Sequence, residues 1–555
     1  MKKVFSTVFF ALAILFCSNA SAQISHGGEP LFNQGIQRIK APIVTLATLD
    51  NDKYLQEDLN QVKGASPLRV AIAQQCDIDV LAESKVTKDN NGTHYTLAIN
   101  SPGATFVSFD FSVFELAEGA TLFFYDQSGE FVLGSFNKSD VKDDGTFYTQ
   151  AIPGSVAYIE YNVPLDTEPG KIILSEVSHG YKNIFQTISN IYDDAESQLK
   201  GSHGHAEGDC HINVVCPEGD DWRDQIRSVV AIEIKSSIGS FMCSGALINN
   251  TALDRTPYVL SAYHCQDEGE IGTLRGFVSY FLYQTNYCNG ASGSGNKSVT
   301  GAQIKAKYSY STGSDFLLLL LDSSVPDNYT PYYAGWDRNN VASPEPGVCI
   351  HHPGGDYKKL SFPRTISRLM GSYINFYQVN WYTGTANKGV TEQGSSGSPL
   401  FNASKRIIGQ LYAGSSACDN MGGADLYGRL YISWTGNNAD NNSLRPWLDP
   451  ENTGVSVLDG LNYTDNTGID DVQTSRNKSL KVYPNPCKGT VRFDIDAIGD
   501  ANYKVFDLNG HCVKEGRTIL TSTVQGIDLS TLSKGSYILK IYTSANIYSA
   551  TIVLL

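Results

Sequence analysis

The chain has 555 residues, whereas one ordinary domain needs about 100–200, so the length predicts about three folded units. Hydrophobic residues make up 41% of the chain and charged residues 18%, which excludes a disordered or collagen-like protein. The 42 basic and 57 acidic residues give a formal net charge of −15, so no nucleic-acid partner is expected.

The first 22 residues have the pattern of a secretory signal peptide. Lys2 and Lys3 precede an apolar run at 4–16, and small residues at 20–22 suit cleavage after Ala22. The apolar run is shorter than the ~20 residues that a membrane-spanning helix needs. The protein is therefore expected to be secreted, either extracellular or at the cell surface, where its 11 cysteines can form disulfides.

The rest of the chain reads as three all-β segments. Residues 23–200 form a β-rich propeptide, with strand-like runs at 93–99, 105–111, 121–125 and 155–161. A polar, acidic stretch ends at Lys200, and the Gly/Ser/His composition from Gly201 predicts flexibility, so a boundary is expected here. Residues 201–460 follow and are again rich in short strands and turns. Residues 461–479 have linker composition, and strands are expected in residues 480–555 at 481–483, 490–495, 503–508 and 537–542.

The strongest chemical signal is the sequence GSSGSP, which contains Ser396 between Ser395 and Gly397. A nucleophilic serine needs its hydroxyl on a tight turn, with backbone N–H groups aimed at the developing oxyanion. Glycine on both sides allows the required backbone dihedrals. Taken alone, the motif is as compatible with an ordinary Ser/Gly turn as with an active site.

Two further motifs favour the active site. His264 follows an apolar strand at 258–260, and Asp315 opens the apolar run at 317–321. A serine hydroxyl needs a neutral imidazole to take its proton, and that imidazole needs a carboxylate to orient it. The alternatives are a structural histidine and a turn aspartate. The order His264, Asp315, Ser396 predicts a catalytic triad.

Long stretches of residues 201–460 resemble the chymotrypsin-fold serine endopeptidases, and among these the bacterial lysyl endopeptidases. The stretches that carry the resemblance are VVCPEGDDWRDQIRSV, CSGALINNT, SAYHC, SDFLLLLLD, YAGWDR, HHPGGDYKK, VTEQGSSGSP, GQLYAGSSAC, YGRLYISWTG and WLDPENTG. The resemblance implies two antiparallel β-barrels, with His264 and Asp315 on the first and Ser396 on the second. It also implies an oxyanion hole formed by the N–H groups of Gly394 and Ser396, and no cofactor.

The resemblance also indicates the specificity. A pocket for a cationic side chain needs a carboxylate at its base. In the lysyl endopeptidase pattern this acid precedes Tyr-Gly-Arg, which is Asp425 here, although a surface-loop aspartate is the alternative. Tyr412 stands where some members have histidine, and it could stack on a histidine ring or donate a hydrogen bond. Ser395 replaces the aspartate of trypsin-type zymogens, so activation through an N-terminal amine is not expected.

Cysteine spacing alone leaves about 15 pairings open for six cysteines. Cys243 and Cys265 flank the histidine loop at the spacing typical of chymotrypsin-like enzymes, and the resemblance further implies the pairs Cys210–Cys418 and Cys216–Cys288. Cys349 is left over and expected to be buried, while Cys487 and Cys512 are a candidate pair. His203, His205, Cys210 and His211 fit no zinc pattern, and His351 and His352 are interpreted as structural, so no metal is expected.

The C-terminal segment contains VYPNP at 482–486 and Gly535-Ser-Tyr537 near its end. It resembles the C-terminal sorting domain of the type IX secretion system, which would make that machinery a partner. A carbohydrate-binding or other β-sandwich module is the alternative.

These features together predict a secreted serine endopeptidase that cleaves on the C-terminal side of lysine in proteins and peptides. It would be made as a preproenzyme that cuts its own Lys200–Gly201 bond, and it would be a monomer when mature. One alternative is a trypsin-like enzyme that accepts arginine and lysine alike. The other is a secreted binding or adhesin protein without activity.

Overall fold

The structure is a computed structural model in two compact units, residues 1–467 and 468–555, which are described separately. It describes residues 26–34, 41–59, 66–142, 144–184, 210–288, 293–294, 297–383, 388–464, 477–493, 499–506, 512–520, 525–542 and 547–555. The expected signal peptide, the Lys200–Gly201 bond, His203 and His205 lie outside these residues. None of the helices in these ranges has the length and apolar character to cross a membrane.

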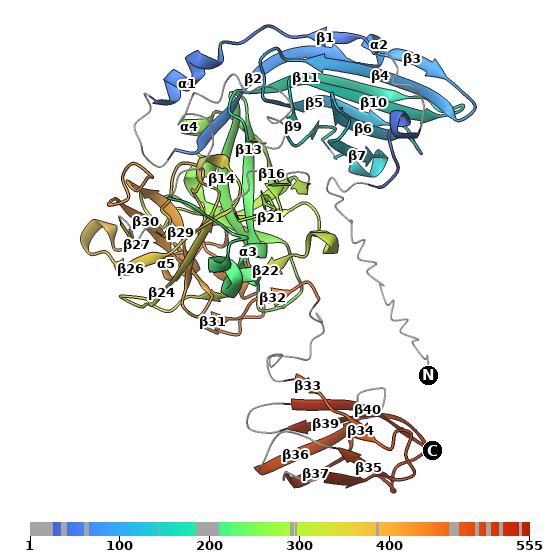
Figure 1. Cartoon of the computed structure of the whole chain (residues 1–555), viewed down its shortest axis with the longest axis vertical. Coiled ribbons are helices and arrows are strands. Elements are labelled where there is room, and N and C mark those ends of the chain that lie inside the picture. Colours follow the sequence, from blue (N-terminus) through green and yellow to red (C-terminus); the bar gives the residue numbers. More distant parts are fainter. Residues whose placement is uncertain are drawn as a thin grey trace, which may run out of the picture. The chain divides into compact units, whose positions relative to one another are not determined.

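The N-terminal part of the first unit is a two-sheet β structure (Figure 1). One sheet has the strand order β1-β4-β10-β6-β7, with β3 beside β4: β1 (Ile43–Thr45), β3 (Lys85–Lys88), β4 (Gly92–Asn100), β6 (Thr121–Asp126), β7 (Val132–Phe136) and β10 (Val156–Pro164). The other contains β2 (Leu68–Asp79), β5 (Phe106–Leu116), β8 (Phe147–Tyr148), β9 (Ile152–Pro153) and β11 (Gly170–Gly180).

An aromatic core joins these two sheets. Phe109, Phe111, Phe114, Phe124 and Phe147 are buried in one cluster, and the rings of Phe114 and Phe147 stack with centroids 3.9 Å apart. Two helices, α1 (Asn51–Leu59) and α2 (Val80–Glu83), belong to this region. All four strands expected between residues 93 and 161 are present.

Six antiparallel strands then form a first barrel in the ring order β13-β14-β15-β21-β20-β16. They are β13 (Val229–Ser236), β14 (Gly239–Leu247), β15 (Tyr258–Ala262), β16 (Leu274–Tyr280), β20 (Ala302–Tyr308) and β21 (Phe316–Leu321), with β19 (Ser298–Thr300) beside β16. Strand β16 pairs with β13 and contacts β20, which closes the ring. Closing the sheet in this way removes its exposed edges.

A second barrel has the ring order β24-β28-β29-β30-β27-β26, where β26 contacts β24. Its strands are β24 (Pro346–His351), β26 (Pro363–Arg368), β27 (Phe376–Trp381), β28 (Pro399–Asn402), β29 (Ile407–Gly414) and β30 (Ala424–Arg429), extended by β25 (Lys359–Ser361) and β12 (Ile212–Asn213). Short helices around the barrels are α3 (Arg223–Ser228), α4 (Glu268–Ile271), α5 (Leu430–Thr435) and α6 (Arg445–Leu448). The structure therefore confirms the expected double antiparallel β-barrel.

Short paired strands complete the first unit. They are β17 (Gln284–Thr285) with β18 (Gly293–Ser294), β22 (Tyr332–Tyr333) with β32 (Leu461–Asn462), and β23 (Trp336–Asp337) with β31 (Val457–Leu458).

The N-terminal region joins the first barrel by strand pairing. Strand β2 lies antiparallel to β14, with Ala71 opposite Ser240 and Arg69 opposite Phe241, so the blue and green strands of Figure 1 share one sheet. Leu68 and Met242 belong to one buried cluster across this junction. Every residue of β13 and β14 is buried, because the barrel core covers one face of these strands and the N-terminal region covers the junction.

The second unit is a small β-sandwich. Its five-stranded sheet has the order β33-β40-β39-β36-β37: β33 (Asn477–Ser479), β36 (Gly499–Phe506), β37 (Cys512–Leu520), β39 (Gly535–Tyr542) and β40 (Ile547–Leu554). The second sheet contains β34 (Val482–Tyr483), β35 (Thr490–Phe493) and β38 (Gln525–Asp528). Cys487 is a free thiol buried in this unit's core, so the candidate pair Cys487–Cys512 is not formed.

Candidate active site

The antiparallel pairing of β15 and β21 brings His264 and Asp315 together. Ala262, at the end of β15, lies opposite Phe316, at the start of β21. His264 follows Ala262 by two residues, and Asp315 directly precedes Phe316. The Nδ1 atom of His264 lies 2.7 Å from Oδ2 of Asp315, and the backbone N–H of His264 donates to Oδ1 at 3.1 Å. Both residues are buried, so the imidazole has a fixed position and orientation.

Asp315 has a left-handed backbone conformation with a φ of 58°, which aspartate tolerates better than most residues. This conformation lets its carbonyl accept a hydrogen bond from the Tyr263 N–H at 3.0 Å while its carboxylate faces His264. Burial raises the pKa of Asp315, and the interactions with His264 oppose that rise. With Nδ1 facing the carboxylate, Nε2 is the atom of His264 left for proton transfer.

Ser396 lies against the first barrel, although its own segment belongs to the second. Its carbonyl accepts a hydrogen bond of 2.7 Å from the N–H of Ser244 on β14. A Cβ at Gly397, where φ is 80°, would lie 2.8 Å from the backbone nitrogen of Ala262, so the turn touches the strand that leads to His264.

Ser396 and His264 are not hydrogen-bonded to each other in this structure. The buried Nε2 of His264 has no hydrogen-bond partner among the described residues, Ser396 included. Hydrogen bonds between catalytic residues are often long before substrate binds. The fold therefore forms the His264–Asp315 bond and holds the Ser396 backbone against strand β14 of the same barrel.

The turn before Ser396 presents two backbone donors. No described residue accepts a hydrogen bond from the N–H of Gly394 or of Ser396. Gly394 has a φ of 88°, and a Cβ there would lie 2.7 Å from the carbonyl oxygen of His352, so only glycine fits. Two free, fixed N–H groups beside a serine hydroxyl are what stabilisation of an oxyanion requires.

Asp425 lies inside the second barrel, fully buried and surrounded by donors. Its Oδ2 atom accepts hydrogen bonds from Trp381 Nε1 at 2.7 Å, Thr391 Oγ1 at 2.6 Å and Ser416 Oγ at 2.5 Å, and Oδ1 accepts one from the Ser416 N–H at 3.2 Å. Burial raises the pKa of Asp425, and the bonds from Ser416, Thr391 and Trp381 counteract it. The surface-loop alternative for Asp425 is therefore wrong.

Three residues of this carboxylate site were missed by sequence reasoning: Trp381, Thr391 and Ser416. Thr391 lies five residues before Ser396, which is the one sequence feature that would have drawn attention to it. Trp381 and Ser416 carry no comparable local signal.

Tyr412 contacts His264, although neither in the stacked arrangement nor through the hydrogen bond that the sequence suggested. The two rings meet edge to face with centroids 6.2 Å apart. The ring of Tyr412 also stacks on Tyr310, with centroids 5.2 Å apart, and contacts Phe376, with centroids 5.0 Å apart. Burial, followed by the negative charge of Asp315, raises the pKa of Tyr412 to about 12. It is therefore a neutral aromatic wall next to the imidazole.

The three disulfides implied by the resemblance are formed: Cys210–Cys418, Cys216–Cys288 and Cys243–Cys265. The described residues contain two clusters of possible metal ligands, one around His211 and one around His264. The other members of both clusters are cysteines that form the first and third of these disulfides. Sulfurs in a disulfide are not thiolates, the form that binds metal. Cys349 is a free, fully buried thiol.

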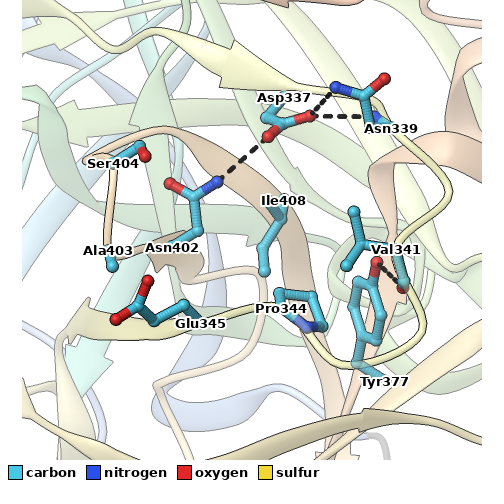
Figure 2. Close-up of a pocket in the computed structure, with 10 residues that line it drawn as sticks. All are labelled: Asp337, Asn339, Val341, Pro344, Glu345, Tyr377, Asn402, Ala403, Ser404 and Ile408. Carbon is cyan, nitrogen blue, oxygen red and sulfur yellow. Dashed lines mark hydrogen bonds between the residues drawn. The ribbon is translucent and has the colours of Figure 1, made fainter.

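Figure 2 shows a pocket of about 200 Å³ in the second barrel that contains none of these site residues. Val341, Pro344, Tyr377 and Ile408 line its apolar part. The Asp337 carboxylate at its rim accepts hydrogen bonds from Asn339 and Asn402.

The two barrels define the class of the middle domain, the chymotrypsin-like serine protease fold. Residues 204–428 match the family model described as the lysyl endopeptidase C-terminal domain, and residues 481–554 match that of a secretion system C-terminal sorting domain. Each of these two segments therefore resembles a domain of the family it matches, and neither segment covers half of the chain. The sorting domain makes the chain a secreted or cell-surface protein.

A lysyl endopeptidase of Pseudomonas aeruginosa is 28% identical to the chain over 298 residues. The match covers 50% of this chain and 59% of that relative, less than two thirds of the relative's length.

Similar solved structures include three chains that each match 37% or 38% of this chain. The thermostable serine protease AL20 from an extremophilic microorganism is 14% identical with a TM-score of 0.29, covering 37% of this chain and 92% of that one. Protease Anisep from Arthrobacter nicotinovorans is 14% identical with a TM-score of 0.27, covering 37% and 90%. Human heparin binding protein is 18% identical with a TM-score of 0.27, covering 38% and 88%.

Proposed function

We propose that this chain is a secreted serine endopeptidase that cuts after lysine and is made as a self-processing precursor. The observations that carry the proposal are the buried His264–Asp315 hydrogen bond and the backbone N–H groups of Gly394 and Ser396, which have no acceptor among the described residues.

In the proposed mechanism, Ser396 Oγ attacks the carbonyl carbon of the scissile bond while His264 Nε2 takes its proton. Asp315 keeps the imidazole in the required tautomer and stabilises the imidazolium that forms. The N–H groups of Gly394 and Ser396 donate to the oxyanion. His264 then protonates the leaving amine, and a water deprotonated by the same imidazole hydrolyses the acyl-enzyme.

Lysine specificity is supported by the charge and burial of Asp425. A buried ammonium group is costly unless a carboxylate meets it, and Asp425 is a fully buried carboxylate near the start of the oxyanion turn, bonded to Thr391. Its donors are all neutral groups, and none of the ion pairs between described residues includes Asp425. Arginine is the competing side chain, since its guanidinium would also pair with a carboxylate.

A precursor is supported by the way in which the N-terminal region is bound. The pairing of β2 with β14 and the shared buried cluster join residues 68–184 to the first barrel in the uncut chain. Cleavage at the expected Lys200–Gly201 bond would break the covalent link between this region and residues 201–460.

The decisive experiment is mass spectrometry of peptides released from a denatured protein mixture, with Ser396→Ala as the inactive control. The expected result is cleavage after lysine by the parent and none by the variant, whose own precursor stays uncut. Cleavage after arginine at a similar rate would show that the specificity is trypsin-like instead. Equal activity in both proteins would show that Ser396 is not the nucleophile.

A further inference from the structure

His351 lies at the end of β24, fully buried, and both of its ring nitrogens are bonded to serine hydroxyls. Nδ1 lies 2.7 Å from Oγ of Ser395, the residue between the two oxyanion donors. Nε2 lies 2.8 Å from Oγ of Ser361 on β25. The proposed mechanism uses none of these three side chains directly.

The neighbouring bonds determine where the protons are. Ser361 Oγ donates its one proton to the carbonyl of Val390 at 2.8 Å, so it must accept from His351, and Nε2 carries the hydrogen. Burial, followed by electrostatic interactions with His211, His352 and Lys359, holds the pKa of His351 well below its usual value. Nδ1 of the neutral ring is therefore an acceptor.

Ser395 completes the chain of hydrogen bonds. Its hydroxyl donates to Nδ1 of His351 and accepts from the N–H of Glu392 at 3.2 Å. His351 is thus connected to both ends of the segment 390–395, to Val390 through Ser361 and to Ser395 directly.

We propose that His351 is a positioning residue that holds the oxyanion turn through Ser395, an inference that rests on the proposed endopeptidase activity. The N–H of Ser396 belongs to the peptide group that follows Ser395, and the N–H of Gly394 belongs to the peptide group one residue before the one that precedes Ser395. Fixing the Ser395 side chain therefore fixes the direction of both donors. The bond through Ser361 holds the beginning of the same segment and contributes to packing.

The two halves of this arrangement can be removed separately. In His351→Asn, the side-chain amide coincides with Nδ1 and its oxygen can still accept from Ser395, but the bond to Ser361 is lost. In His351→Gln, the amide nitrogen coincides with Nε2 and can still donate to Ser361, but the bond to Ser395 is lost. Both variants bury one amide, so they are matched controls for each other.

The experiment measures kcat and KM on a lysyl peptide amide for the parent and both variants. Active sites are counted by complete labelling with a fluorophosphonate. We expect His351→Gln to lose about 10²-fold in kcat, the scale of a small misplacement of catalytic groups, with KM nearly unchanged. His351→Asn should retain most of the parental kcat per labelled site. Equal kcat for the two variants would overturn the inference.

Ser395→Ala covers the case in which neither histidine variant folds. It keeps both oxyanion N–H groups and removes only the hydroxyl, so kcat should again fall about 10²-fold per labelled site. An unchanged kcat in this variant would overturn the positioning role. Failure of the endopeptidase proposal itself is recognised separately, because the parent would then neither cleave the peptide nor react with the fluorophosphonate.

Discussion

The junction between the N-terminal region and the first barrel contains a buried ion pair that can be tested directly. Nζ of Lys235 on β13 lies 2.9 Å from Oδ2 of Asp110 on β5 and 2.7 Å from Oγ of Ser108. The Lys235 side chain is 1% exposed and that of Asp110 is 8% exposed. Burial disfavours the ammonium, but the carboxylates of Asp110 and Glu233 outweigh this effect and raise the pKa of Lys235.

Asp110→Ala removes the nearest counter-charge and leaves the ammonium buried. At an effective dielectric constant of 20, charges at this separation attract by about 6 kcal/mol before desolvation is counted. Breaking a buried pair on one side typically costs about 3–5 kcal/mol of unfolding free energy. Replacing both partners by apolar residues, as in Asp110→Leu with Lys235→Met, should cost far less than the single change.

The measurement is urea unfolding of the full chain in the Ser396→Ala background, which prevents self-processing. All 5 tryptophans lie between residues 222 and 447, so tryptophan fluorescence reports the barrels, while far-UV circular dichroism reports the whole chain. The control is Glu118→Ala, which removes an exposed ion pair with Lys138 and should change the free energy by less than about 1 kcal/mol. The reasoning is refuted if Asp110→Ala matches this control, or if the double variant loses as much as the two single changes added together.

Three further predictions concern the barrels. Asp315→Asn should lower kcat by about 10⁴, because the amide favours the wrong imidazole tautomer, and steady-state assays on a lysyl amide test this. Because burial raises the pKa of Asp425, its carboxylate takes up a proton as the pH falls, starting above the usual range of aspartate. The ratio of kcat/KM for lysine over norleucine substrates should fall in parallel, and a constant ratio would exclude Asp425 from recognition. Burial raises the pKa of Cys349 to about 12, so iodoacetamide at pH 8 should alkylate it only after unfolding, as read by mass spectrometry.

Much of the architecture could be predicted from local patterns. The apolar run at 317–321 became a strand that is buried almost throughout, and the run at 155–161 became a strand in which buried and less buried residues partly alternate. The three disulfides and the approach of His264 to Asp315 were also expected, although from resemblance and chemical need rather than from periodicity.

The partners around the carboxylate site could not be predicted in the same way. Trp381 and Asp425 are 44 residues apart, and they meet because β27 pairs with β30 in a register that the barrel sets. Cys487 had a possible partner in Cys512 by composition, yet its side chain packs as a free thiol in the sandwich core.

The sequence by itself determined which groups are chemically able to act: a serine between glycines, a histidine and an aspartate at strand ends, and an acid before Tyr-Gly-Arg. Tertiary structure alone decided which groups contact and support them. Examples are the hydrogen bond between His351 and Ser395 and the pairing of strand β2 with strand β14. The physical reason is that a strand's pattern reports which of its faces is buried. The residue that covers this face depends on sheet register and on contacts between segments far apart in the chain.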